Sequence, residues 1–233
     1  LSSAYILSII AYYIFSREKA THEDKVEMLV FVRNAQITSH FTTSLDSKLE
    51  VVAKTIRDSK DFGEINYKLA KSKIHPLKIS ADDVERMLDL QYGNPAILPV
   101  LQLLYPNLDF KNSTFHIDHI YPKSKFKSNN QDLPVDYHGK ANFLFNLQLL
   151  QGEENLDKKA KDPELWLKDF YQNDEAKISA YKERNYIDAN LDLNWRRIKD
   201  FETKRSKLIR DKLESIFGHK PKVYSPDQIL DLF

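Results

Sequence analysis

The sequence predicts a mainly α (α+β) protein, a helical body in which a short β-hairpin is embedded. The chain has only five glycines among 233 residues and many Leu, Lys, Asp and Ile, a composition that favours helices. Apolar residues recur at helical spacing, most clearly over residues 195–217. By contrast, residues 115–118 and 143–149 alternate with the period of two that is typical of strands.

Bulk composition fits an ordinary globular protein with one large domain or two small ones. The apolar fraction of 42% allows a real core. Because 35 basic and 34 acidic residues give a net charge of +1, any surface for nucleic acid must be local. Cysteine is absent, which rules out disulfides and thiolate zinc sites and fits a reducing cytoplasm. No Gly-rich phosphate loop is present, so we expect no nucleotide hydrolysis.

Residues 1–15 are apolar, and the first charge is at Arg17. The stretch is too short to span a bilayer comfortably, and it has neither a basic leader nor a small-residue cleavage site. We therefore expect no membrane association and predict a buried helix. Because the chain begins without Met and directly in this pattern, we expect it to be a fragment of a longer protein.

Local signals place the other helices before the hairpin. Residues typical of helix starts stand at Thr21, Ser80 and Asn94-Pro95. Another helix is expected over residues 44–57, whereas the helical pattern weakens over residues 59–76.

After the hairpin and a short polar helix from about Glu153, Asp162-Pro163 begins a further helix. The long helix at residues 195–217 ends at Gly218 and has a basic outer side, which could lie along a phosphate backbone. A solvated face with internal ion pairs explains the same pattern. The basic residues of that side are Arg196, Arg197, Lys199, Lys204, Arg205, Lys207, Arg210 and Lys212. A final short helix is expected from Ser225.

The first strand carries a group of side chains suited to phosphodiester hydrolysis. That reaction needs a base to deprotonate water and a cation to neutralise charge on the scissile phosphate. Neutral imidazole suits the first task, since its pKa is about 6.5, and magnesium prefers carboxylate or amide oxygens. Asp118 and Asn155 supply such oxygens, and His119 is the adjacent base.

Strand geometry restricts how these residues can cooperate. The period of two sends Asp118 and His119 to opposite sides, so both can serve one phosphate only if the strand twists or ends there. Pro122 predicts such an end. The same alternation places His116 on the face of Asp118, where it could bind metal, touch the phosphate or have only a structural role.

Asp118-His119-Ile120 with Pro122, then the run from Asn146 to Leu150, then Asn155, resemble the HNH nuclease motif of the ββα-metal fold. The resemblance covers residues 115–159. It implies that Asp118 and Asn155 hold a magnesium or manganese ion, that His119 is the general base, and that Asn146 braces the loop carrying His119. The products would carry 5′ phosphate and 3′ hydroxyl ends.

Residues 116–122 also resemble the His-x-(Asp/Glu)-His-Ile-x-Pro core of the C-terminal HNH domains in GmrSD-type, modification-dependent restriction enzymes and their anti-phage relatives. This resemblance implies a role in restriction or phage defence, DNA as the partner, including modified or phage DNA, and a nucleotide-dependent sensor domain upstream. The chain departs from zinc-stapled HNH enzymes in having no Cys pairs, so helical packing must hold the hairpin. The loop over residues 121–142 is longer than the compact motif requires.

Lysines close to the motif are candidate clamps for a phosphate backbone. Lys123, Lys125 and Lys127 would present their ammonium groups on one side if that stretch is extended. Lys158 and Lys159 belong to the short helix after the second strand. We interpret all but Lys127 as DNA-binding residues, together with Arg196 and Arg197.

The sequence thus predicts an N-terminal helical region at 1–110, an HNH nuclease core at 111–160, and a C-terminal helical region at 161–233 that packs on the core. Two alternatives remain open. One is a catalytically degenerate HNH-like module that binds nucleic acid, and the other is a helical protein-interaction domain whose histidines are structural.

Overall fold

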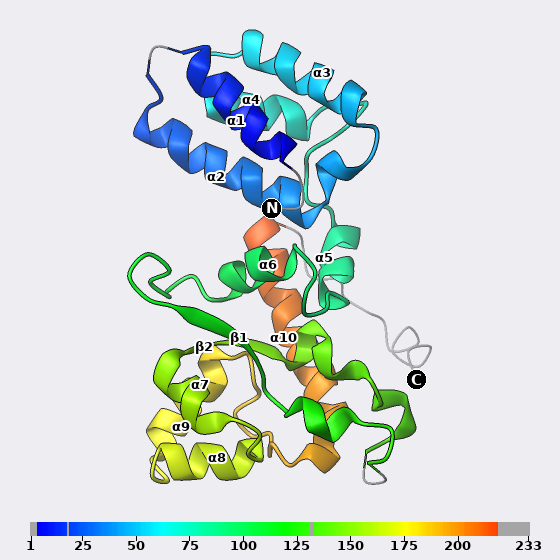
Figure 1. The fold of residues 1–233 in the computed structure, drawn as a ribbon, viewed down its shortest axis with the longest axis vertical. Coiled ribbons are helices and arrows are strands. Elements are labelled where there is room, and N and C mark those ends of the chain that lie inside the picture. Colours follow the sequence, from blue (N-terminus) through cyan, green and yellow to red (C-terminus); the bar gives the residue numbers. More distant parts are fainter. Residues whose placement is uncertain (1–3, 18, 131–132, 219–233) are drawn as a thin grey trace.

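A computed structural model describes residues 4–17, 19–130 and 133–218, apart from the side chains of Glu153 and Asn155. Helices dominate these residues, and their one sheet is a two-stranded antiparallel pair (Figure 1), which confirms the mainly α (α+β) fold. The short helix expected from Ser225 lies outside the described residues.

The α-helices are α1 (Tyr5–Phe15), α2 (His22–Ile37), α3 (Leu45–Arg57), α4 (Phe62–Ala70), α5 (Ala81–Leu88), α6 (Ile97–Leu104), α7 (Gly152–Lys158), α8 (Pro163–Phe170), α9 (Glu175–Arg184) and α10 (Ile198–Phe217). The strands are β1 (Phe115–His119) and β2 (Leu147–Gln151). Short 3₁₀ helices are η1 (His40–Thr42), η2 (Lys123–Phe126), η3 (Val135–Tyr137), η4 (Lys140–Asn142), η5 (Leu144–Asn146) and η6 (Trp195–Arg197).

Helix starts follow the capping signals in the sequence. Thr21 and Ser80 each accept a backbone N–H with the side-chain oxygen, from Asp24 and Asp83, and both aspartates bond back to the backbone of the cap. These reciprocal bonds satisfy amide groups that a helix start leaves unpaired. Two helices lie where the sequence predicts none: α4, in the weak stretch, and α9.

Helices α1 to α4 lie together at one end of the elongated molecule (Figure 1) and share a core of their own. Helix α1 buries Ile6, Ile9 and Tyr13 in it. Its other side is exposed, with Leu7 at 55% and Phe15 at 93%. The prediction of a buried helix is therefore right for one face of α1 and wrong for the other.

A second apolar cluster joins α5 and α6 to the hairpin and to the C-terminal half of α10, through Val84, Leu101, Leu147 and Ile209 among others. Packing therefore groups the segment from Ile79 with the hairpin, whereas the predicted boundary falls at residue 110. A third cluster continues from the loop after β1 into α8, α9 and the start of α10. Helix α10 thus contributes to two cores, and it runs past the hairpin in Figure 1.

The hairpin strands pair antiparallel, with Asp118 opposite Gln148 and His119 opposite Leu147. Strand β2 begins at Leu147, later than predicted, because the chain forms the 3₁₀ turn η5 just before it. Phe143 makes only an isolated bridge to Gln91. The predicted helix follows β2 directly, as α7.

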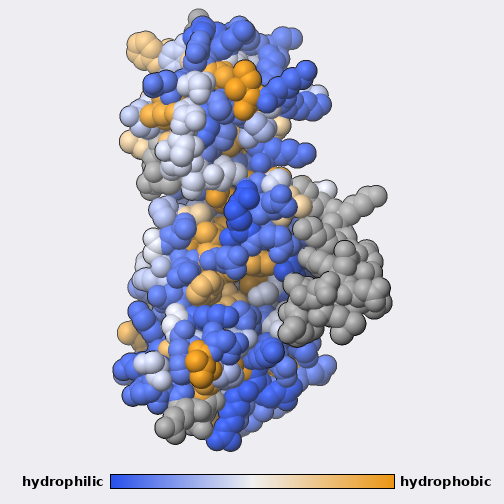
Figure 2. Space-filling model, turned by 90° about the vertical axis from the view of Figure 1, so that its right-hand side faces the viewer, coloured by the Kyte–Doolittle hydropathy of each residue, from blue (hydrophilic) through white to orange (hydrophobic). Residues whose placement is uncertain are grey.

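Outside the core, the surface is mostly polar. The face drawn in Figure 2 is mainly hydrophilic, with hydrophobic residues in separate patches. No helix in the described ranges has the length and apolar character needed to cross a membrane.

Candidate functional site

Strand β1 ends at His119, which is the end that Pro122 predicts. The chain then turns away, and the carbonyl of Asn146 accepts the backbone N–H of Ile120 at 2.8 Å. Strand β2 leads straight into α7, so the order is strand, loop, strand, helix. This arrangement brings Asp118, His119 and Asn146 into one small region.

The buried side chain of Asn146 ties three backbone positions together. Its Oδ1 accepts the N–H of Tyr121 at 2.8 Å, and its Nδ2 donates to the carbonyls of Tyr121 at 3.0 Å and Ala141 at 2.9 Å. A buried carboxamide whose oxygen and nitrogen are both hydrogen-bonded fixes the backbone around it. Moving that backbone would leave buried polar groups without partners, which costs free energy. The chain leaving His119 is therefore clamped against η4 and η5.

Asp118 is held from both sides by polar groups. Its Oδ2 lies 2.8 Å from the ammonium of Lys158 and accepts a 3.0 Å bond from Nε2 of Gln148, its cross-strand neighbour. The other end of Gln148 accepts the hydroxyl of Tyr181, from α9, at 2.6 Å. Both contacts to the carboxylate use Oδ2, and its side chain is 17% exposed.

Lys158 is a buried structural cation, which corrects its prediction as a DNA clamp. The residue is 0% exposed, and Nζ also donates to the carbonyl of His119 at 2.5 Å. The indole of Trp166 lies under the ammonium, 5.9 Å from it. Burial lowers the pKa of Lys158 and the charge of Asp118 opposes that shift. An ammonium enclosed in this way cannot reach a phosphate backbone.

The half-buried ring of His119 has different neighbours from those of Asp118. Its Nε2 lies 2.9 Å from Oδ1 of Asn142, and the ring of Tyr92 lies 5.8 Å away, centre to centre. Tyr92 is 52% exposed. Neither Tyr92 nor Asn142 belongs to the motif that the sequence singles out, and Gln91 and Phe143 beside them form the isolated bridge.

A hydrated magnesium ion takes one or two protein oxygens and completes its shell with water and phosphate, so a single carboxylate can be its protein ligand. Asp118 is the carboxylate in this region, and its contacts with Lys158 and Gln148 both use Oδ2. The side chain of Asn155 lies outside the described residues. His116 is exposed on β1, and within the described ranges no three His, Cys, Asp or Glu side chains form a group that could hold a metal ion.

The remaining lysine candidates lie on the surface near the loop after β1. Lys123 is exposed, and half-buried Lys125 places its ammonium 5.4 Å from the ring centre of Trp195. Lys123 and Lys125 lie in the 3₁₀ helix η2 and Lys127 follows it, so the extended backbone on which the one-sided row depends is not formed. Lys159 is exposed and has positive φ, at 46°, just after α7.

Arg196 and Arg197 lie in η6, where the predicted long helix begins. The guanidinium of Arg196 lies over the ring of Trp195 at 5.7 Å, and Arg197 pairs with Asp200 at 2.5 Å. Both arginines are exposed, and Arg197 would have to exchange its carboxylate partner to meet a backbone phosphate.

Arg205 was predicted on the basic outer side of this helix, but it is 0% exposed. Its guanidinium donates to the carbonyls of Leu144 at 2.9 Å, Phe145 at 2.7 Å and Leu147 at 2.8 Å, and to that of Asn185 at 2.9 Å. Burial lowers its pKa. Arg205 therefore fixes the segment that carries Asn146, and helical spacing alone gives no sign of this because its partners are backbone atoms.

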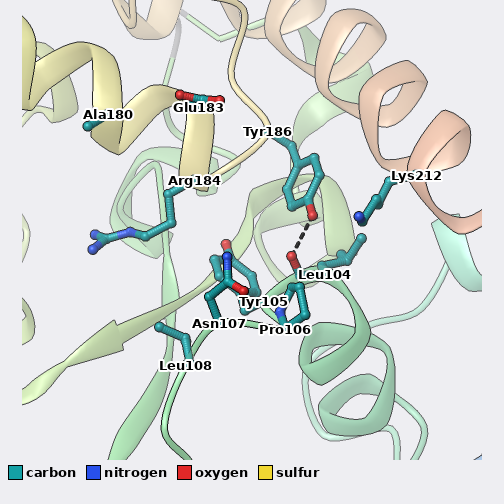
Figure 3. Close-up of a pocket in the computed structure, with 10 residues that line it drawn as sticks. All are labelled: Leu104, Tyr105, Pro106, Asn107, Leu108, Ala180, Glu183, Arg184, Tyr186 and Lys212. Atoms are coloured by element: carbon teal, nitrogen blue, oxygen red, sulfur yellow. Dashed lines mark hydrogen bonds between the residues drawn. The ribbon is translucent and has the colours of Figure 1, made fainter. Parts of the chain in front are cut away.

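A pocket of about 470 Å³ lies apart from these residues, between α9, the segment after α6, and Lys212 of α10 (Figure 3). The hydroxyl of Tyr186 donates to the carbonyl of Leu104 at 2.5 Å across it. Arg184 extends away from this bond and pairs with Glu154 at 2.8 Å. Of the residues that line this pocket, only Lys212 was singled out in the sequence, as part of the basic side of the long helix.

Comparisons with known proteins give no independent assignment. No protein-family model matches the chain, and no curated protein matches its sequence.

Proposed function

We propose that the chain is a metal-dependent HNH-type endonuclease domain that hydrolyses DNA phosphodiester bonds. The observation that carries this proposal is the clamp around Asn146, which joins the end of β1 to the start of β2 beside His119. The hairpin runs directly into α7, which supports the ββα resemblance.

In this proposal His119 is the general base. Its imidazole takes a proton from water, the water oxygen bonds to phosphorus, and the bond from phosphorus to the 3′ oxygen breaks. Asp118, with Asn155, would hold magnesium or manganese, and Asn146 positions the base. The bound metal would neutralise charge on the scissile phosphate and the departing oxygen. Lys123, Lys125, Lys159, Arg196 and Arg197 are the proposed contacts to the DNA backbone.

Cleavage of supercoiled plasmid with magnesium, manganese or EDTA tests the proposal. We expect metal-dependent nicking by the parent and a loss of at least about 100-fold in His119→Ala and Asp118→Ala, the usual contribution of a general base. His22→Ala, an exposed histidine at the start of α2, is the matched control. Equal rates for the parent and His119→Ala would refute the assigned role. A single-stranded RNA substrate tested in parallel distinguishes the two nucleic acids.

One observation favours a second candidate, a degenerate HNH-like module that binds nucleic acid without cutting it. The ammonium of Lys158, 2.8 Å from Asp118, already neutralises the carboxylate expected to hold the metal. This candidate predicts that the protein binds DNA without added metal. It also predicts that titration calorimetry detects no binding of magnesium or manganese. The nuclease predicts metal binding that Asp118→Ala abolishes.

We further propose, from the resemblance to GmrSD-type proteins, that the domain is the effector of a cytoplasmic restriction or phage-defence protein with a nucleotide-dependent sensor upstream. Cells carrying the full-length gene should restrict a phage with modified DNA, and His119→Ala in that gene should abolish the protection. Equal plaque counts with and without the gene would count against this role while leaving the nuclease chemistry untouched.

A further inference from the structure

The loop between β1 and β2 brings a carboxamide back to His119. Asn142 stands 23 residues after His119, and its Oδ1 lies 2.9 Å from the histidine Nε2. Both side chains are half-buried. The loop is longer than a compact hairpin needs, and the extra length brings the carboxamide of Asn142 back to the imidazole of His119.

Asn142 is held in place through its backbone. Its carbonyl accepts the N–H of Tyr92 at 2.7 Å, and the neighbouring N–H of Leu144 donates to Leu90 at 2.8 Å. Gln91 and Phe143 form the bridge between the same two segments. A side chain whose backbone is held by these bonds to residues 90–92 loses little freedom when it bonds the imidazole, which favours a single geometry.

The contact bears on which ring nitrogen of His119 carries the proton, because Oδ1 of Asn142 is the atom that faces Nε2. An amide oxygen only accepts hydrogen bonds, so the Nε2 atom that faces it must carry hydrogen, and in neutral imidazole the other nitrogen is then an acceptor. We propose that Asn142 is a positioning residue that holds His119 in the Nε2–H tautomer and directs the Nδ1 lone pair to the reacting water. The second half of this inference rests on the proposed nuclease function.

The tautomer can be measured without any activity. Two-bond ¹H–¹⁵N correlation spectra of the protein in EDTA, at a pH where imidazole is neutral, distinguish Nδ1–H from Nε2–H. His119→Gln identifies the signals by their loss. We expect Nε2–H in the parent and in Asn142→Asp, which keeps an acceptor oxygen, and a mixture of tautomers in Asn142→Leu.

Two results would overturn the proposal. The first is Nδ1–H in the parent, which would mean that the carboxamide is turned over and donates from Nδ2. The second is an unchanged tautomer in Asn142→Leu, which would mean that Asn142 does not select it. An Asn190→Leu protein, changed at an exposed asparagine between α9 and α10, controls for the substitution itself.

Kinetics add a readout that a purely structural role would not produce. A displaced base lowers the rate of the bound complex, so Asn142→Leu should reduce kcat for plasmid cleavage about 100-fold with KM within about twofold. A parent that never cleaves would refute the proposed function and leave the tautomer result standing. A parent that cleaves no faster than Asn142→Leu would refute the positioning role alone.

Discussion

Lys158 joins both motif residues of β1 through one ammonium group, which contacts the carboxylate of Asp118 and the carbonyl of His119. A buried ion pair of this kind repays its desolvation only while both partners are present. Removing the ammonium leaves the Asp118 carboxylate without its counter-ion and the His119 carbonyl without its hydrogen-bond donor. We infer that Lys158 organises the site from below the surface.

Lys158→Met should therefore lower the free energy of unfolding by about 3 kcal/mol, the usual cost of removing one partner from a buried pair. Urea denaturation followed by circular dichroism measures the change. Lys159→Met, at the adjacent exposed position, is the matched control and should change stability little. Equal midpoints for the two variants would show that the buried contact is not stabilising.

His40 makes the stability of the fold depend on pH. Burial, with help from Lys48 and His75, lowers the pKa of His40 from 6.5 to about 4. Between these values the unfolded chain binds more protons than the folded protein, so stability is complete above pH 6.5 and falls as the pH drops towards 4. The loss attributable to His40 is up to about 3 kcal/mol, since one pKa unit corresponds to about 1.4 kcal/mol.

Unfolding free energies of the parent and of His40→Gln at several pH values between 4 and 7 test this. The parent should lose more stability than His40→Gln over that interval, because the variant lacks the titrating ring. Parallel curves for the two proteins would mean that His40 titrates alike in both states.

Among the elements, α10 and η5 are joined by Arg205, which donates to four backbone carbonyls inside the protein. Three of these carbonyls belong to the residues from Leu144 to Leu147, which flank Asn146. The helix thus replaces hydrogen bonds that the irregular turn cannot make within itself. The geometry of the Asn146 clamp depends on α10 for this reason.

Arg205→Met should lower the free energy of unfolding by about 3 kcal/mol or more, because the carbonyls stay buried without donors. It should also speed amide hydrogen exchange at Ile120 and Tyr121, whose N–H groups bond to Asn146. Arg197→Met, at an exposed arginine of η6, is the control and should stay within about 0.5 kcal/mol of the parent. An unchanged amide exchange rate at Ile120 would show that Arg205 does not support the hydrogen bonds around Asn146.

What the sequence can predict follows from the range of each interaction. Thr21 and Ser80 cap helices through bonds to residues three positions away, so their helices were predictable from local pattern. The hairpin was predictable from its alternation. Lys158 and Arg205 look like solvated cations in a helical pattern, and only the folded chain brings their partners from 20 to 61 residues away. The role of Asn142 is not predictable from local pattern either, because its partner His119 lies 23 residues away in the sequence.

At the scale of the whole molecule, the core of α1 to α4 is separate from the two cores that surround the hairpin. Phe62 lies at the centre of the N-terminal core, 0% exposed and in edge contact with the rings of Tyr13 and Phe31. The cores are linked through the chain and at the C-terminal half of α2, which contacts α6, packs Ile37 on the second core and places Arg33 over the ring of Phe217. Damage to the first core should therefore spread little to the site.

Phe62→Ala should cost about 3 to 5 kcal/mol of stability in α1 to α4, as large truncations in packed cores do. Amide exchange should accelerate throughout these helices while the amides of β1 and β2 keep their protection. Leu147→Ala, in the core beside the hairpin, is the converse test. It should accelerate amide exchange in β1 and β2 more than in α1 to α4. Equal acceleration in both regions would show that the molecule unfolds as one unit.

The carbonyl bonds of Arg205 also have a consequence for the order of assembly during synthesis. A ribosome releases the chain from its N-terminus, so residues 144–147 emerge well before the guanidinium that satisfies them, 58 to 61 positions later. Until then the turn before β2 lacks its donor, and the clamp beside His119 lacks its support. A nascent chain would thus carry an incomplete Asn146 clamp until Arg205, in the first half of α10, has left the ribosome.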